Sequence, residues 1–194
     1  MRFIKGLVAA FIVTFLCGLT WQGYKMFIGL EETVESELAR MEAEGAPDFE
    51  IKSDTIKNID NLYKIGTPVT LVHFWASWCG PCIDEFPELL ALNKKNKNIT
   101  IVVVSEDESE KEYRAFLKTI NFEENQRLIS VLDEDYKIAG LFGTEKLPET
   151  YILGKNKQLI RKVPNPEKWD SPIVDQYFEA IVKQEIERPA EDRN

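Results

Sequence analysis

Two cysteines that stand three positions apart are the residues of this sequence best suited to chemistry. Cys79 and Cys82 enclose Gly80 and Pro81, and they follow an apolar, β-prone run over residues 69–75. Such a run is typical of a strand buried on both faces. Vicinal thiols that can close and open a disulfide predict reversible thiol–disulfide exchange.

The residues after the first cysteine favour a helix, from about Cys79 to Lys95. A thiol at a helix N-terminus faces unpaired backbone N–H groups and the positive end of the helix dipole. We therefore expect the pKa of Cys79 to lie below the ordinary thiol value of about 8.5, which favours the attacking thiolate. Cys82 lies one turn later on the same face and can resolve a mixed disulfide. Pro81 suits the first helical turn, and Gly80 leaves the approach to Cys79 open.

The same spacing is also half of a zinc site, which needs two further ligands. Besides the pair, the chain offers only His73 and Cys17 as histidine and cysteine ligands, and Cys17 lies in an apolar N-terminal run. A carboxylate or a second subunit could complete such a site. Redox chemistry is nevertheless favoured, and we expect neither a bound metal nor a cofactor.

The surrounding pattern predicts the elements that position the dithiol. After the first strand and helix we expect strands at 99–104 and 128–132, helices at 108–119 and 136–142, a hairpin of 150–153 with 159–163, and a closing helix at 171–183. Phe49 to Ile51 alternate and predict an edge strand. Ile173, Tyr177, Phe178 and Ile181 form the apolar side of the closing helix. This order predicts an α/β fold with a mixed central sheet flanked by helices.

The N-terminus predicts a membrane anchor. Residues 6–24 carry no charge over 19 positions, and Arg2 and Lys5 precede them. As a helix they would span roughly 28 Å, close to the hydrocarbon thickness of a bilayer. The positive-inside rule keeps the N-terminus in the cytoplasm and exports the rest, which makes a single-pass protein of the cytoplasmic membrane. A cleaved signal peptide is the alternative, but no A-x-A cleavage pattern follows the run.

Four segments follow from these patterns: an anchor at 1–30, a helical stalk at 31–45, one domain at 46–185 and a polar tail at 186–194. The stalk's apolar stripe of Val34, Leu38 and Met41 is too short for a coiled coil, so we expect a solvated stalk and a monomer. A short dimerisation seam is the alternative. The net charge of −9 argues against nucleic acid as a partner.

Several segments carry a resemblance to a known family. Residues 74–82 (FWASWCGPC) resemble the active-site segment of thioredoxins. Residues 46–49 and 85–87 resemble the TlpA/ResA-type branch of membrane-anchored extracytoplasmic thioredoxins, and residues 142–151 resemble its segment around a cis-proline. The Pro-Glu-Thr within that last segment is also similar to the cytochrome c maturation thioredoxins. The resemblance covers roughly residues 46–185 and implies a thioredoxin fold.

The resemblance assigns roles around the substrate. It implies that Pro148 is cis and faces the dithiol, and that Leu147 pairs with an extended substrate segment by strand addition. An ordinary trans proline in a loop is the alternative. Trp78, Gly80 and Pro81 would line the substrate rim, whereas Trp75 is expected in the core.

Two further residues are candidates for proton handling. By the resemblance Glu85, one turn after Cys82, relays protons as a partly buried carboxylate with a raised pKa. A solvated helix glutamate is an equally weighted alternative. His73 occupies the strand position where cytoplasmic thioredoxins carry a buried acid, so it is either a proton relay or a hydrogen-bonded core histidine. His73 departs from the family pattern, as does Lys146, where that branch often has glycine.

The leading hypothesis is an enzyme that reduces disulfides of exported proteins, apocytochrome c among them, and is kept reduced by a membrane electron donor. The Gly-Pro between the cysteines resembles reducing thioredoxins, and an oxidising role is the alternative direction. Two other classes remain as rivals. One is a thiol metallochaperone that passes copper through Cys79 and Cys82. The other is a non-catalytic scaffold at the membrane.

Overall fold

The computed structural model describes residue 20 and residues 35–53 and 55–189. The chain divides into two compact units, residues 1–39 and 40–194. In the first unit, Thr20 and residues 35–39 are helical, and the rest of the predicted anchor lies outside the described residues. Within the described part of the chain, no helix has the length and apolar character needed to cross a membrane.

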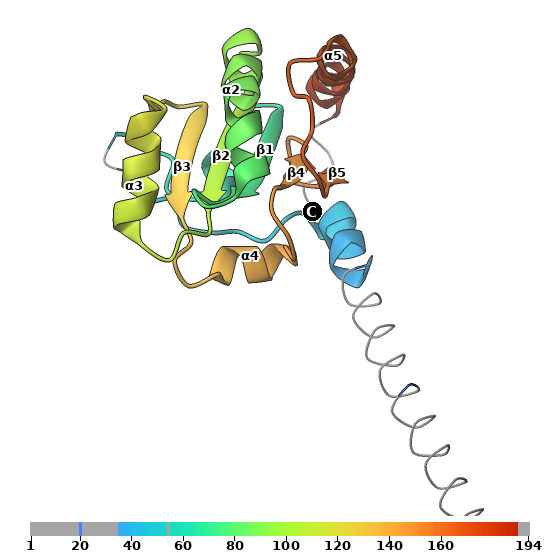
Figure 1. Ribbon diagram of the computed structural model, residues 1–194. Helices are drawn as coiled ribbons and strands as arrows, with labels where there is room; N and C mark the ends of the chain where they lie inside the picture. Colours follow the sequence, from blue (N-terminus) through green and yellow to red (C-terminus); the bar gives the residue numbers. More distant parts are fainter. Residues whose placement is uncertain (1–19, 21–34, 54, 190–194) are drawn as a thin grey trace, which may run out of the picture. The chain divides into compact units, whose positions relative to one another are not determined.

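The second unit contains the sheet and the helices that pack on it (Figure 1). Its elements are η1 (Leu62–Lys64), β1 (Val69–Trp75), α2 (Gly80–Lys95), β2 (Ile99–Ser105), α3 (Glu110–Thr119), β3 (Leu128–Leu132), α4 (Lys137–Phe142), β4 (Glu149–Leu153), β5 (Leu159–Val163) and α5 (Pro172–Glu187). The predicted order of strands and helices from residue 69 onward is confirmed. Pro87 lies inside α2, and the helix continues past it to Lys95.

The sheet is mixed, as predicted, with the strand order β3-β2-β1-β4-β5. β1 lies at its centre, parallel to β2 and antiparallel to β4. The register places Phe74 opposite Glu149 and His73 opposite Thr150. The carboxyl end of β1, which leads to the dithiol, therefore lies beside the amino end of β4, which follows Pro148. In Figure 1, α4 lies across the end of the sheet where β2 and β3 finish.

Successive side chains of β1 point to opposite faces of the sheet, so each face has its own apolar core. Trp75 is fully buried, as predicted, and its ring centroid lies 4.7 Å from that of Phe86 on α2. On the other face, the centroid of Phe74 lies 5.4 Å from Phe142 and 5.8 Å from Tyr151. Apolar side chains of α2, α3 and α5 join the cluster that contains both cysteines. The dithiol is thus attached to a rigid, closely packed layer.

The predicted edge strand over residues 49–51 is wrong. Glu50 makes only an isolated bridge with Asn61. The Ile51 amide donates to the carbonyl oxygen of Asp60, so this segment pairs with the loop before η1 and not with the sheet.

Two expectations about helical faces also differ from the structure. Ile173, in the first turn of α5, was expected on the apolar side of the closing helix, but it is 79% exposed. Phe178 and Ile181 are buried as expected. Met41, in the predicted stalk, is fully buried, so this position is not solvated.

Candidate active site

The two cysteines form a disulfide at the start of α2. Cys79 is the N-cap residue of the helix, and the Cα atoms of the pair lie 5.3 Å apart. Cys79 is 7% exposed, whereas Cys82 is completely buried. Cys79 is therefore the member of the pair that has exposed surface. The roles of Cys79 as attacking thiol and Cys82 as resolving thiol stay a prediction.

A buried acid holds the loop that enters the dithiol. Oδ1 of Asp107 accepts hydrogen bonds from the backbone N–H of Ser77 at 3.0 Å and from its hydroxyl at 2.7 Å. Oδ2 of the same carboxylate accepts from the hydroxyl of Ser105, the last residue of β2, at 2.7 Å. Asp107 is fully buried. Sequence reasoning missed this residue, although an acid two positions after a buried strand is a usable signal.

The surface around the dithiol is apolar and open. Trp78 is 65% exposed, and Ile83 on the first turn of α2 is also exposed. A Cβ atom built on Gly80 would meet no atom within 4 Å, so this residue leaves free space beside Cys79. Trp78, Gly80 and Pro81 lie where a substrate rim was predicted, and their role in binding stays a prediction.

The peptide bond between Leu147 and Pro148 is cis, as predicted. Pro148 directly precedes β4, whose first residue, Glu149, lies opposite Phe74 near the end of β1. Leu147 is partly buried and packs against the apolar cluster that includes both cysteines. The segment is therefore at the same edge of the sheet as the dithiol, where the predicted strand addition would occur.

Glu85 is not the solvated helix residue of the alternative interpretation. Its side chain is buried, and Oε2 accepts hydrogen bonds from the backbone N–H of Glu167 at 3.0 Å and from the indole N–H of Trp169 at 3.2 Å. Burial raises the pKa of Glu85 to about 7; the two hydrogen bonds oppose this effect, and the charges of Glu88 and Glu167 add to it. A carboxyl that titrates near neutral pH is suited to proton exchange, and Glu85 follows Cys82 by one turn of α2.

His73 is both a core histidine and a neighbour of that carboxyl. It is fully buried on β1, and its Nδ1 lies 2.9 Å from the hydroxyl oxygen of Thr150 on β4. Its Nε2 lies 3.4 Å from Oε1 of Glu85. Burial lowers the pKa of His73 to about 3, so the imidazole is neutral at physiological pH. The structure therefore brings the two predicted proton-handling residues together.

Sequence reasoning missed the residues that complete this environment. Glu167 and Trp169 come from the loop before α5, far along the chain from α2. A tryptophan within a polar run is the one local sign of such a contact.

Glu106 is a further carboxyl that sequence reasoning missed, and its backbone N–H donates to the carbonyl oxygen of Trp75 at 2.8 Å. Burial raises the pKa of Glu106 to about 7, and the charges of Asp133 and Glu149 add to the effect.

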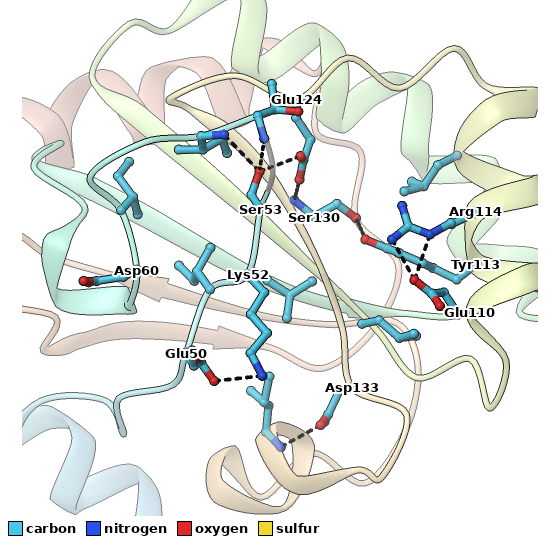
Figure 2. Close-up of a pocket in the computed structure, with 18 of the residues that line it drawn as sticks. Glu50, Lys52, Ser53, Asp60, Glu110, Tyr113, Arg114, Glu124, Ser130 and Asp133 are labelled. Atoms are coloured by element: carbon cyan, nitrogen blue, oxygen red, sulfur yellow. Dashed lines mark hydrogen bonds and ion pairs between the residues drawn. The ribbon is translucent and has the colours of Figure 1, made fainter.

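A large groove of about 1260 Å³ lies away from the cysteines, between residues 50–60, α3, β3 and the start of α4 (Figure 2). Its polar side chains largely bind one another: Glu124 accepts from the hydroxyl of Ser53 and from the amide of Ser130, and Arg114 pairs with Glu110. Neither cysteine lines it. Among the residues that the structure describes, no cluster of three or more His, Cys, Asp and Glu could hold a metal ion.

Comparison with known proteins agrees with this site. Residues 43–162 match the AhpC/TSA family. The thiol–disulfide oxidoreductase ResA of Bacillus subtilis is 26% identical over 156 residues, which cover 78% of this chain and 80% of that protein. The thioredoxin-like protein YneN of the same organism is 28% identical over 155 residues, or 77% of this chain and 84% of that protein.

Two solved structures show the shared fold. A chain assigned as a thiol:disulfide interchange protein DsbE from Chlorobium tepidum superposes with a TM-score of 0.63 at 23% identity, covering 73% of this chain and 97% of that one. StoA from Bacillus subtilis gives a TM-score of 0.55 at 21% identity, covering 69% and 95%. The predicted thioredoxin-like fold is confirmed. The chain belongs to the AhpC/TSA family, and it is a thiol–disulfide oxidoreductase whose redox pair is Cys79 and Cys82.

Proposed function

We propose that this oxidoreductase reduces disulfides of exported proteins from a membrane-anchored position outside the cytoplasm. The observation that carries the proposal is the contrast between the two cysteines, since Cys79 is 7% exposed next to the exposed Trp78 and Cys82 is completely buried. A protein-sized disulfide needs an accessible attacking sulfur next to an apolar rim. The resolving sulfur, in turn, benefits from protection against other partners.

The reaction proceeds by two exchanges. The Cys79 thiolate attacks a substrate disulfide, which forms a mixed disulfide and releases one substrate sulfur with its electron pair. Cys82 then loses its proton and attacks the sulfur of Cys79, which forms the Cys79–Cys82 bond and releases the second substrate sulfur. The substrate gains two electrons and the pair is left oxidised. A membrane electron donor that supplies two electrons returns the pair to the dithiol.

Two features support a reducing direction of electron flow and a membrane-anchored location. The Gly80-Pro81 pair between the cysteines resembles that of reducing thioredoxins, and the uncharged run at residues 6–24 is long enough to anchor the chain. The likeness of Pro148-Glu149-Thr150 to cytochrome c maturation thioredoxins makes apocytochrome c thiols one candidate substrate among exported proteins.

The reduction potential tests the direction of electron flow. The full chain in detergent is equilibrated with glutathione or dithiothreitol buffers, and tryptophan fluorescence follows the redox state. A potential near that of thioredoxin, roughly −270 mV or lower, supports a reductase, whereas a value near roughly −120 mV makes the protein an oxidant and overturns the proposal. A variant with both Cys79→Ser and Cys82→Ser is the control and should show no redox-dependent fluorescence change.

A pair of reporter fusions tests the location. Alkaline phosphatase at the C-terminus should be active, and green fluorescent protein at the same position should be dark after export through the Sec route. The matched control is the same pair of fusions to a chain that lacks residues 1–30. Bright fluorescence and inactive phosphatase on the full chain would reject the extracytoplasmic location and leave the disulfide chemistry untouched.

A further inference from the structure

We infer that His73 and Glu85 hold a single proton between them in the protein interior, and that His73 changes its tautomer each time Glu85 gains or loses a proton. His73 is then a positioning residue for the carboxyl that follows Cys82 by one helical turn. The inference concerns the dithiol site itself and holds for either direction of electron flow.

One ring nitrogen of His73 and one carboxyl oxygen of Glu85 face each other in the protein interior. Nε2 of His73 and Oε1 of Glu85 lie 3.4 Å apart, and in the described part of the chain both are buried atoms that make no hydrogen bond. Phe86 presents its ring edge-on to the imidazole at 6.3 Å between centroids. Because buried polar atoms are nearly always hydrogen-bonded, a proton between Nε2 and Oε1 is the arrangement that satisfies both.

The other carboxylate oxygen decides where a proton can sit. Oε2 of Glu85 already accepts two N–H groups, from the Glu167 backbone and the Trp169 indole. Both groups are donors only, so a proton on Oε2 would displace one of them. When Glu85 is protonated, its proton therefore resides on Oε1 and is donated to Nε2 of His73.

The second ring nitrogen completes the argument, because a neutral imidazole carries one N–H group. With Glu85 protonated, Nε2 accepts, so the ring proton is on Nδ1 and is donated to the hydroxyl oxygen of Thr150, 2.9 Å away. With Glu85 ionised, Nε2 carries the proton and donates it to Oε1, and Nδ1 accepts from the Thr150 hydroxyl. A hydroxyl can act either way, so every atom is satisfied in both states.

Burial keeps the imidazole from becoming a cation, and no basic group acts on the pair in the described part of the chain. From α2, Glu88 and Cys82 lie within one turn of Glu85, and from the loop before α5, Glu167 faces it; the charges that act on Glu85 there are acidic. From β4 the Thr150 hydroxyl contacts the imidazole of His73. Burial raises the pKa of Glu85 to about 7 and lowers that of His73 to about 3, so an ion pair of the two is unfavourable.

The pair would act in the resolving step. As the sulfur of Cys82 bonds to that of Cys79, the bond from Cys79 to the substrate breaks, and the substrate sulfur leaves with the electron pair. The proton of Cys82 passes to the Glu85 carboxylate. His73 then accepts a hydrogen bond from the carboxyl where it previously donated one, so the buried acid is stabilised on both sides of the transfer.

The test uses the fact that His73 is the only histidine of the chain. The full chain, purified without a histidine tag and labelled with ¹⁵N-histidine, gives one imidazole whose nitrogen shifts report both charge and tautomer. Between pH 5 and 9 we expect a neutral ring that carries its proton on Nδ1 at low pH and on Nε2 at high pH, with a midpoint near the Glu85 pKa of about 7. Glu85→Gln should abolish the exchange and leave one tautomer throughout.

Glu88→Gln is the matched control, because Glu88 lies on the same helix and its Oε2 accepts from the backbone N–H of Trp169 at 3.0 Å. It removes a neighbouring charge but not the proton partner, so the exchange should persist. Three results would overturn the inference: a ring that becomes doubly protonated near its ordinary pKa, a single tautomer across the range in the unaltered chain, or an exchange that survives Glu85→Gln.

Kinetic measurements distinguish a positioning role of His73 from a role in core packing alone. The rate of disulfide closure, measured against pH, should show an inflection that belongs to Glu85. His73→Leu removes the donor to the carboxylate and should move the inflection upward by about one pH unit. In His73→Gln the side-chain amide can donate or accept a hydrogen bond, so the inflection should return part of the way to its pH in the unaltered chain. An inflection that does not move in His73→Leu would contradict the positioning role.

Discussion

The indole N–H of Trp169 donates a hydrogen bond of 3.2 Å to Oε2 of Glu85, which fastens the loop before α5 to the helix that carries the dithiol. The backbone N–H of Trp169 also donates to Oε2 of Glu88 at 3.0 Å, one turn further along the same helix face. The loop thereby removes Glu85 from solvent. The protonation of this carboxyl consequently affects stability as well as chemistry.

Glu85→Gln should change how stability depends on pH. Burial raises the pKa of Glu85 from 4.5 to about 7, so in this window the folded chain holds a proton that the unfolded chain has lost. The free energy of unfolding of the unaltered chain should therefore fall, relative to the variant, as pH rises from 4.5 to 7, by about 3 kcal/mol in total. Urea unfolding of both oxidised proteins at a series of pH values measures this difference.

Glu106 titrates in the same window but is present in both proteins, so its contribution cancels in the comparison. Parallel stability curves for the two proteins would show that Glu85 has an ordinary pKa in the folded chain.

Asp107→Asn should destabilise the domain by about 2 kcal/mol, because the buried carboxylate accepts from the amide and hydroxyl of Ser77 and from Ser105. The replacement amide offers one acceptor oxygen in place of two. Chemical unfolding of the oxidised chain measures the loss. Asp135→Asn is the control, since Asp135 is exposed and pairs only with Lys137 on the surface. An equal response of the two variants would contradict the role given to Asp107.

Cys82→Ala should trap the substrate. Without a resolving thiol the mixed disulfide at Cys79 cannot be released, and it should accumulate as a species that dithiothreitol cleaves. Cys79→Ala should form none, because the remaining sulfur of Cys82 is fully buried in the folded chain. Non-reducing electrophoresis with a disulfide-containing protein substrate, followed by mass spectrometry, distinguishes the two. Efficient trapping through Cys82 would reverse the assigned roles.

Lys157→Met should remove a gain in stability at alkaline pH. Lys157 is buried, and its Nζ donates to the carbonyl oxygen of Ile65 at 2.9 Å. Burial lowers its pKa from 10.5 to about 8, so above pH 8 the unfolded chain holds a proton that the folded chain has released. Between pH 8 and 10.5 the unaltered chain should gain up to about 3 kcal/mol relative to the variant.

Lys155→Met is the matched control for this comparison, because Lys155 lies in the same turn with an exposed side chain. Urea unfolding at several alkaline pH values follows all three proteins. If the Lys157 and Lys155 variants keep the same pH dependence as the unaltered chain, the buried lysine has an ordinary pKa.

The sequence alone determined the order of the elements from residue 69 onward and the place of the dithiol. Both depend on local physics. Periodicity separates the buried strand β1 from the helix that follows it, and Cys79 becomes the N-cap residue because Gly80 and Pro81 open α2. The resemblance of residues 142–151 to a cis-proline segment also predicted the isomer of the bond before Pro148.

The tertiary structure alone decided the environment of the two proton-handling residues. Whether Glu85 is solvated or buried depends on Trp169, and whether His73 has a partner depends on the antiparallel register of β1 with β4, which brings Thr150 opposite it. For the same reason Phe49 to Ile51 could not be recognised as lying outside the sheet. Helix and strand periodicity report which residues share a face, whereas burial and pKa depend on what later segments of the chain place against that face.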